Sequence, residues 1–341
     1  MALPDEQYPG AGPGTRRRTR GPGSLRGHAA LVTGASRGLG LLIARELSDQ
    51  GCRLLICARD AAALDRAAGE LRARGAEVHA LACDVTDAES PQRLMAAAIK
   101  HFGGLDLLVN NAGVIQVGPL DAMTEDDFRS AMETMFFAPL RLVLAAVPVM
   151  RERGGGRIVD VTSIGGRLAA PHLLPYAAAK FAATGLSEGL RAELAPSNIR
   201  VTTVVPGLMR TGSHGAARFS GQAGQEYAWF ATAASLPLLS MDGERAARAI
   251  VRAAMRNRSE LVLTVVAKIA VRAHGLAPAT TVRALTVANR LLPQPGAAPE
   301  HNTTGTGAAR SLGNRAVGLL TTLGDRAARR NNEPGGGAAR T

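Results

Sequence analysis

Lysine and tyrosine are scarce in this chain of 341 residues. Only three of its 40 basic residues are lysine, and only three residues are tyrosine. Aromatic residues make up 3% of the chain. A nucleic-acid-binding surface combines clustered basic side chains with aromatic rings that stack on bases. The net charge of +12 is spread along a chain that lacks those rings, so we expect no nucleic-acid partner.

Cysteine is equally sparse. Cys52, Cys57 and Cys83 form no CxxC pair, so neither a disulfide scaffold nor a metal site is predicted. The arginines at 16–20 are followed by Gly-Pro-Gly and not by an apolar stretch, so the sequence does not resemble a secretion signal. No run of 18 uncharged apolar residues occurs, and we expect no segment to span a bilayer. The expected location is cytoplasmic.

Short apolar runs alternate with amphipathic stretches of helical length from residue 28 onward. The runs are continuous, as in strands buried on both faces, and the alternation predicts right-handed βαβ units. The expected fold class is α/β, a doubly wound, Rossmann-type parallel sheet of seven strands. The predicted strands are 29–33, 53–57, 78–82, 105–110, 157–161, 200–205 and 261–265, and the helices are 38–50, 60–74, 87–102, 124–152, 175–195 and 242–257.

Composition divides the chain into four parts. Residues 1–24 predict a flexible basic arm, and 25–265 one Rossmann-type domain. Residues 266–292 predict a helical extension interrupted by glycine and proline. Residues 293–341 are rich in Gly, Pro, Asn, Thr and Arg, and predict a largely disordered tail with one short helix at 315–330.

The first predicted strand runs directly into the glycine loop, Thr33-Gly-Ala-Ser-Arg-Gly-Leu-Gly40, and a helix follows. Gly34 permits a sharp turn, Gly38 lets a pyrophosphate approach the backbone, and Gly40 lets helix and strand pack closely. The helix N-terminus then presents free N–H groups to the phosphates. The loop therefore predicts a dinucleotide site.

Tyr176 and Lys180 lie four residues apart on one predicted helix, and so on one face. An ammonium group close to a phenol favours the tyrosinate, so we expect Lys180 to lower the pKa of Tyr176 and allow proton exchange nearer neutral pH. The alternative from these two residues alone is a surface tyrosine beside an extended lysine.

Five motifs in order resemble the short-chain dehydrogenase/reductase family, over about residues 26–265. They are the glycine loop, Asn110-Asn-Ala-Gly113, Ser163 placed 13 residues before Tyr176, the Tyr176-x-x-x-Lys180 pair, and Pro206-Gly207 followed by Thr211. The resemblance implies a nicotinamide-dependent enzyme that interconverts a carbonyl and an alcohol by hydride transfer. It also implies a small-molecule substrate and a dimer or tetramer of identical chains.

The resemblance implies roles for individual residues. Tyr176 would be the general acid and base, Lys180 would hold the nicotinamide ribose, and Ser163 would bind the substrate carbonyl, with Thr162 as the alternative hydroxyl. The residues implied to bind cofactor are Thr33, Gly34, Ser36, Arg37, Gly38, Leu39, Gly40, Arg59, Asp84, Val85, Asn110, Ala112, Gly113, Tyr176, Lys180, Pro206, Gly207 and Thr211.

One position departs from the family pattern. Met135 stands where the family has a catalytic asparagine, whose main-chain carbonyl holds a water in a proton relay. Methionine keeps the carbonyl and loses the amide side chain, so we expect a perturbed relay. The alternative function is a catalytically impaired, cofactor-binding regulatory or scaffold protein.

The residues after the second predicted strand bear on cofactor choice. Ala58 takes the place of the acid that binds the adenosine ribose in NAD-dependent proteins, and Arg59 follows it. Arg37 in the glycine loop could join Arg59 around a 2′-phosphate. We therefore favour NADP(H) over NAD(H), although Asp60 would be that acid if the alignment shifted. Asp84 would accept a hydrogen bond from the adenine.

The substrate side is less specific. Residues 212–240 hold several aromatic side chains, which favour either an apolar pocket or a helix packed on its own core, so an apolar ketone or secondary alcohol is the expected substrate. His172 and His214 are expected at the surface, with polar anchors of the pocket as the alternative. The basic, apolar stretch 262–292 fits a core cap, a subunit contact or, less favoured, a peripheral membrane contact.

Overall fold

A seven-stranded, all-parallel sheet forms the centre of the molecule in the computed structural model, which describes residues 24–333 apart from 238, 297–298 and 314. Its order is β11-β7-β6-β4-β1-β2-β3. The chain therefore turns back between β1 and β4, and this switch point is where doubly wound sheets bind ligands. The strands are β1 (Ala29–Thr33), β2 (Arg53–Ala58), β3 (Val78–Ala82), β4 (Leu107–Asn110), β6 (Gly156–Val161), β7 (Ile199–Val205) and β11 (Glu260–Val262). The predicted fold class is confirmed.

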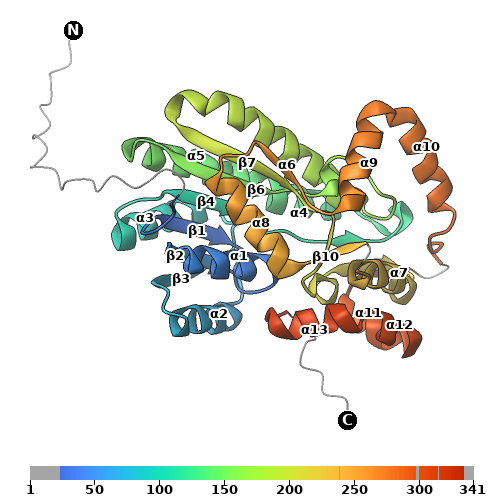
Figure 1. Cartoon of the computed structure of the whole chain (residues 1–341). Coiled ribbons are helices and arrows are strands. Elements are labelled where there is room, and N and C mark those ends of the chain that lie inside the picture. Colours follow the sequence, from blue (N-terminus) through green and yellow to red (C-terminus); the bar gives the residue numbers. More distant parts are fainter. Residues whose placement is uncertain (1–23, 238, 297–298, 314, 334–341) are drawn as a thin grey trace, which may run out of the picture.

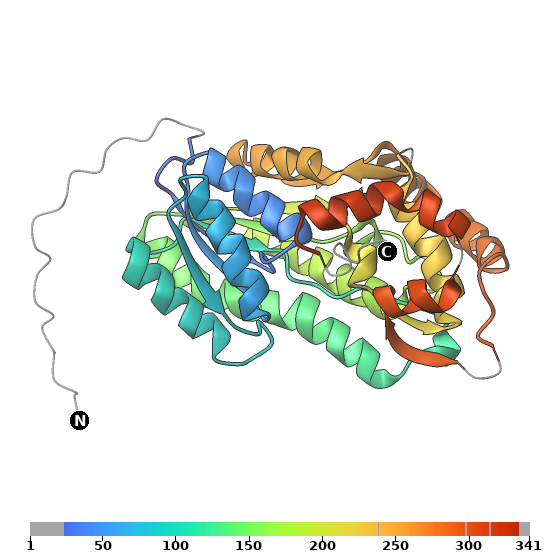
Figure 2. The ribbon, with the colours of Figure 1, turned by 90° about the horizontal axis from the view of Figure 1, so that it is seen from below.

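Helices cover both faces of the sheet (Figures 1 and 2). One core joins the sheet to α1 (Gly38–Asp49), α2 (Ala61–Ala73) and α8 (Gly243–Met255). The other core joins the opposite face to α3 (Ser90–Phe102) and α5 (Ala138–Glu152). The central strands β1, β2, β4 and β7 are mostly buried, which explains their continuous apolar runs, whereas the edge strands β3 and β11 are only partly buried.

The stretch predicted as one helix over 124–152 is three pieces. α4 (Glu125–Met132) passes through a π-helical turn, Glu133–Phe137, into α5. Judged by length and composition alone, Glu125–Glu152 could cross a membrane, with a mean hydropathy of 1.5. It is not an uncharged run, because it contains Glu133 and Arg141. Its buried residues, among them Leu142, Ala146 and Met150, pack on the sheet, as in the core helix of a globular domain.

The catalytic-side elements follow β6. A short 3-10 turn, Ile164–Gly166, leads to the long helix α6 (Leu174–Glu193). Two small sheets lie beyond the main sheet, one of β8 (Leu208–Arg210) with β10 (Ser240–Asp242), the other of β12 (Glu300–Thr304), β9 (Arg218–Gly221) and β5 (Gln116–Val117). They carry α7 (Ala223–Ser235) at the substrate side.

The C-terminal part differs from the prediction of a largely disordered tail over 293–341. Within residues 299–333, β12 is followed by α11 (Gly305–Leu312), α12 (Arg315–Leu320) and α13 (Thr322–Arg330). Ala308 of α11 is buried against the aromatic side chains of α7 and β9, which the sequence offered no way to pair with it. Residues 334–341, and nearly all of the predicted basic arm at 1–24, lie outside the described part.

The predicted extension at 266–292 forms a helical hairpin of α9 (Val265–Leu276) and α10 (Pro278–Asn289). It stands away from the sheet, at the upper right of Figure 1. α10 has no buried residue and α9 has one, Ala267, so the hairpin covers little of the core.

Candidate active site

Ser163 lies at the carboxyl end of β6, where ligands bind in a parallel sheet. Its Oγ accepts a hydrogen bond of 3.0 Å from the N–H of Gly165, which starts the turn toward α6. The hydroxyl of the neighbouring Thr162 instead donates to the carbonyl of Val204 on β7, at 2.7 Å, and is buried. Thr162 is thus used in holding β6 to β7, and Ser163 is the hydroxyl that faces Tyr176.

Tyr176 lies on the first turn of α6, against Gly165. A Cβ added to Gly165 would stand 3.1 Å from the Tyr176 ring and 3.4 Å from Ser163 Oγ, so the glycine keeps these groups together. Burial raises the pKa of Tyr176, and a hydrogen bond with Ser163 opposes the shift. The expected lowering by Lys180 is wrong for this arrangement, because burial outweighs the other influences on the phenol.

Lys180 is 6% exposed and lies one turn further along α6. Its Nζ donates to the carbonyl of Val161 at 2.8 Å and stands 5.8 Å from the centroid of the Tyr176 ring. Burial lowers the pKa of Lys180 to about 8, and the negative charge of Asp160 opposes this. The amine therefore sits where it exchanges protons at moderately basic pH.

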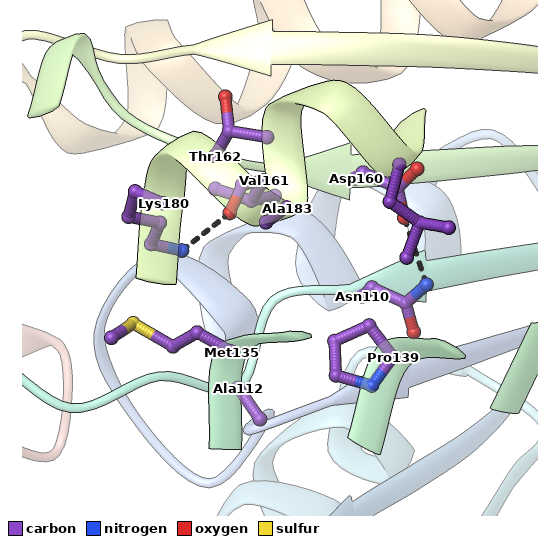
Figure 3. Close-up of a pocket in the computed structure, with 10 residues that line it drawn as sticks. Asn110, Ala112, Met135, Pro139, Asp160, Val161, Thr162, Lys180 and Ala183 are labelled. Carbon is purple, nitrogen blue, oxygen red and sulfur yellow. Dashed lines mark hydrogen bonds between the residues drawn. The ribbon is translucent and has the colours of Figure 1, made fainter. Parts of the chain in front are cut away.

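A cavity of about 10 Å³ lies beside Lys180, between α6 and the π-helical turn (Figure 3). At the side of the cavity away from Lys180, Asp160 accepts a hydrogen bond of 2.8 Å from the amide of Asn110. Burial raises the pKa of Asp160. Asn110 Oδ1 has no hydrogen-bond partner among the described residues. This volume is about one water molecule, and a polar wall is what such a molecule needs.

Met135 lines the same cavity from the opposite side, 2% exposed. It packs on Ala131 and Ala179, within the π-helical turn of the α4–α5 stretch. A π-helical turn displaces the carbonyls of a helix from their regular pairing, and such turns are frequent at functional sites. Met135 thus lies within the π-helical turn, and the perturbed relay stays a prediction.

The glycine loop joins β1 to α1 at the switch point. Thr33 Oγ1 accepts hydrogen bonds from the N–H groups of Asn111 and Ala112, at 2.9 and 3.0 Å. Gly34 and Gly38 have φ of +64° and +55°, a region that favours glycine. A Cβ on Gly40 would overlap the carbonyl of Gly34. The loop therefore has the close packing that a dinucleotide site requires.

The charged residues around the outer end of the loop are paired. Arg59 follows β2, and its Nη1 lies 3.7 Å from Asp84 Oδ2. Asp60 accepts a hydrogen bond of 2.9 Å from the N–H of Ala63 and caps α2. Asp60 is thereby engaged at the N-terminus of α2.

The other residues predicted to bind the cofactor lie in different parts of the fold. Ser36 and Leu39 belong to the loop, and Gly113 lies against Met135. The side chain of Asn110 turns to Asp160 inside the sheet, and Val85 is buried in the core below α3. Pro206, Gly207 and Thr211 follow β7 on the far side of the cleft: the carbonyl of Pro206 accepts from Ile164, and a Cβ on Gly207 would overlap Thr264.

The substrate side is held by a buried polar group that the sequence did not reveal. Glu226 on α7 is fully buried, and its carboxylate meets His172 Nδ1 and Trp229 Nε1, each at 2.7 Å. His214 Nε2 lies 3.1 Å from Asp325 on α13. Both histidines are buried, so the expectation that they lie at the surface is wrong. Phe219, Tyr227 and Phe230 pack with α11 as a core of their own.

The C-terminal strap, residues 331–333, is the largest feature that sequence analysis missed. Glu333 lies on the glycine loop, 3.2 Å from Arg37 Nε, and its side chain is 5% exposed. Burial raises the pKa of Glu333 to about 7, with Arg37 opposing the shift. Glu333 lies in a segment rich in Gly, Arg and Asn, and nothing in that sequence indicates that it contacts the glycine loop.

A dinucleotide-binding sheet with Ser, Tyr and Lys gathered at its carboxyl edge defines the class of nicotinamide-dependent oxidoreductases. Residues 28–219 match the family model described as short chain dehydrogenase. The chain belongs to this family and is an NAD(P)-dependent oxidoreductase. The recognition made from the five motifs is confirmed.

Relatives of known name and structure agree with this. Dehydrogenase/reductase SDR family member 4 of Rattus norvegicus is 39% identical over 188 residues, 55% of this chain and 67% of that protein. A putative ketoacyl reductase 1 of the granaticin polyketide synthase from Streptomyces violaceoruber is 37% identical over 200 residues, 58% and 73%. The L-sorbose reductase of Gluconobacter frateurii, solved with NADPH and L-sorbose, superimposes with a TM-score of 0.64 at 26% identity, covering 71% of this chain and 97% of that one.

Proposed function

We propose that this protein is an NADP(H)-dependent reductase or dehydrogenase that interconverts an apolar ketone and its secondary alcohol, with Tyr176 as general acid and base. The observation that carries the proposal is the grouping of Ser163, Tyr176 and Lys180 between β6 and α6, at the sheet edge that also holds the glycine loop. The loop has the backbone of a dinucleotide site, because a Cβ at Gly34 or Gly40 would clash with the neighbouring backbone of Ala112 or Gly34.

The chain's own groups have distinct tasks in that reaction. The bound nicotinamide would supply or take the hydride. Ser163 donates a hydrogen bond to the substrate oxygen, and Tyr176 gives that oxygen a proton in reduction or takes it in oxidation. Lys180 donates to the carbonyl of Val161, 5.8 Å from the centroid of the Tyr176 ring, and would hold the nicotinamide ribose.

The preference for NADP(H) over NAD(H) rests on arginine. Arg37 and Arg59 flank the outer end of the loop, and the side chain of Arg59 is 66% exposed. A 2′-phosphate would receive two guanidinium groups there, an arrangement suited to bidentate pairing. The L-sorbose reductase was solved with NADPH, which supports the same choice.

Following NADPH absorbance over a panel of apolar ketones tests the activity. The Tyr176→Phe variant should lose about 10²–10⁴-fold in kcat while its Kd for NADPH stays unchanged. Tyr227→Phe, the other described tyrosine, is the matched control. Full turnover by Tyr176→Phe, or a higher kcat/KM with NADH than with NADPH, would contradict the corresponding part of the proposal.

Met135 provides a test of the proton path. If its side chain perturbs the relay, Met135→Asn should raise kcat at neutral pH. Unchanged turnover would show that the carbonyl of the π-helical turn is sufficient and the side chain irrelevant.

We also propose a homo-oligomer in the cytoplasm. Phe137 and Leu144 on the α4–α5 stretch and Phe181 on α6 are 43%, 64% and 41% exposed, and such apolar side chains favour burial against a second copy. Light scattering after size exclusion, with Leu144→Glu as the disrupting variant, measures the state.

A further inference from the structure

The C-terminal strap crosses the glycine loop and is bonded to it at several points. The N–H of Gly38 donates to the carbonyl of Asn331 at 2.8 Å. The amide of Asn332 donates to the carbonyl of Ser36 at 2.7 Å and to that of Ala63 at 3.1 Å. The amide of Asn331 donates to Thr211 at 3.3 Å, across the cleft. The strap therefore bridges both sides of the nucleotide end.

Glu333 lies in the space that the glycine at position 38 leaves open. Its Oε1 is the nearest atom to a Cβ built on Gly38, and its Oε2 pairs with Arg37. The start of α1 offers this carboxylate a favourable place, because the helix has no side-chain cap and no acidic residue in its first turn.

A phosphate group bound at the loop would lie at the same place. Gly38 would admit the pyrophosphate, and Arg37 is the residue proposed to meet the 2′-phosphate. A carboxylate and a phosphate in this volume would repel each other and would overlap. We propose that Glu333 and the C-terminal strap are an intramolecular competitor of the dinucleotide, which must displace them in order to bind.

The strap is anchored at the substrate side. α13 packs on α7, with Gly324 against His214 and Ser235. Asp325 pairs with His214, and the carbonyl of Arg330 accepts a hydrogen bond of 3.0 Å from Arg45 on α1. Figure 2 shows α13 running toward the N-terminal elements. Displacement of the strap is therefore linked mechanically to the helix that lines the substrate side.

The inference rests on the proposed binding of a dinucleotide to the glycine loop, and the test separates the two. NADPH titrations compare the full chain, a chain ending at Arg330, and Glu333→Ala. The strap makes several hydrogen bonds of modest net strength, so we expect the Kd for NADPH to fall at least about tenfold on truncation and severalfold in Glu333→Ala, which removes the carboxylate from the loop. Glu300→Gln, an exposed acid of the same C-terminal region, is the matched control and should leave the Kd unchanged.

Three results would overturn the competition. An unchanged Kd on truncation means that the strap does not compete, and a weaker Kd means that it is part of the binding site. If no form binds NADPH or NADH, the cofactor assignment fails and the competition fails with it. Hydrogen exchange gives a second readout: amides at 322–333 should exchange faster when NADPH is added to the full chain.

A separate observation concerns the α9–α10 hairpin. Seven of the 16 large apolar side chains that are exposed in the described chain lie within it or just after it. Residues 261–299 contain Lys268, Arg272, Arg283 and Arg290 and no acidic residue. Val265, Ile269 and Leu276 are 63–88% exposed and share one face of α9 by helical spacing, with Lys268 and Arg272 along its edge.

An apolar face edged by cations, on a hairpin that covers little of the core, has the chemistry of a lipid-surface contact. α9 also begins beside the active-site cleft, where Ala267 and Thr264 contact Gly207. We infer that the hairpin binds the surface of an anionic membrane, with the apolar side chains in the headgroup region and the basic ones on lipid phosphates.

Vesicle flotation of the full chain tests this contact. Vesicles of phosphatidylcholine with phosphatidylglycerol should carry the protein, and vesicles of phosphatidylcholine alone should not. Lys268→Gln with Arg272→Gln should weaken binding about thirtyfold, at about 1 kcal/mol for each charge, and Ile269→Ser with Leu276→Ser should abolish it. Arg248→Gln with Arg252→Gln, also exposed and four residues apart, is the matched control.

Equal binding to both vesicle types, or to neither, would overturn the inference. So would a dimer in light scattering that Ile269→Ser dissociates, because a second copy would then cover the face.

Discussion

The two ends of the cleft differ in how far along the chain their parts come from. At the catalytic end, Ser163, Tyr176 and Lys180 belong to one continuous strand–turn–helix segment. At the nucleotide end, the glycine loop is closed by a strap in which Asn332 bonds to a residue 296 positions earlier. The catalytic end is therefore arranged by local chain geometry, whereas the nucleotide end depends on a distant segment that can leave.

The largest effect should separate two adjacent hydroxyls at the catalytic end. Ser163→Ala removes a donor to the substrate oxygen, and we expect kcat to fall about 10²–10³-fold, as for loss of one oxyanion donor. Thr162→Val removes a bond to β7 and should lower Tm with little change in kcat. Steady-state kinetics and thermal unfolding of both variants measure this. If Thr162→Val lowered kcat and Ser163→Ala did not, the catalytic hydroxyl would be that of Thr162.

The next prediction concerns Lys180, and Lys268 serves as its control. Lys180→Met should lower kcat about 100-fold, while Lys268→Met leaves it unchanged. Since burial lowers the pKa of Lys180 to about 8, the folded chain releases a proton there that the unfolded chain keeps until near 10.5.

The wild-type free energy of unfolding should therefore rise, relative to Lys180→Met, by about 1 kcal/mol per pH unit between pH 8 and 10. Urea unfolding at several pH values measures it. A difference that stays constant with pH would show that Lys180 has an ordinary pKa.

At the nucleotide end, two glycines give a matched pair. Gly40→Ala places a Cβ on the carbonyl of Gly34, and we expect a loss of about 1–3 kcal/mol in stability. Gly69 lies in α2 with open space around it, and Gly69→Ala should add about 0.5–1 kcal/mol. Chemical denaturation compares them. Equal free energies of unfolding for the two variants would mean that the loop adjusts to the added methyl group more easily than its packing indicates.

The smallest effect concerns pH at the strap. Because the pKa of Glu333 in place is raised to about 7, protonation favours the bound strap, and its competition strengthens as pH falls from 7 toward 4.5. The charged groups that face the strap are Arg37, Arg45 and Arg66. The Kd for NADPH should weaken severalfold from pH 7.5 to 5.5, more in the wild type than in Glu333→Gln. Parallel titration curves would exclude Glu333 as the titrating group.

The sheet and the local motifs could be predicted from the sequence because each is formed by consecutive residues. Continuous apolar runs located all seven strands to within a few positions, and the spacing of Tyr176 and Lys180 placed both on α6. The rest depended on contacts between distant segments. Ala308 gives no local sign that it packs on α7, and Glu333 resembles any acid in a polar tail. The burial that raises the pKa of Tyr176 is likewise a property of the assembled fold.

The strap also sets an order of assembly. Synthesis runs from the N-terminus, and domains fold as their segments emerge. The glycine loop is made nearly 300 residues before Glu333, so a growing chain passes through a period in which the loop exists and its internal competitor does not. A dinucleotide that binds in this period meets an open site, and the strap then has to settle around an occupant already in place.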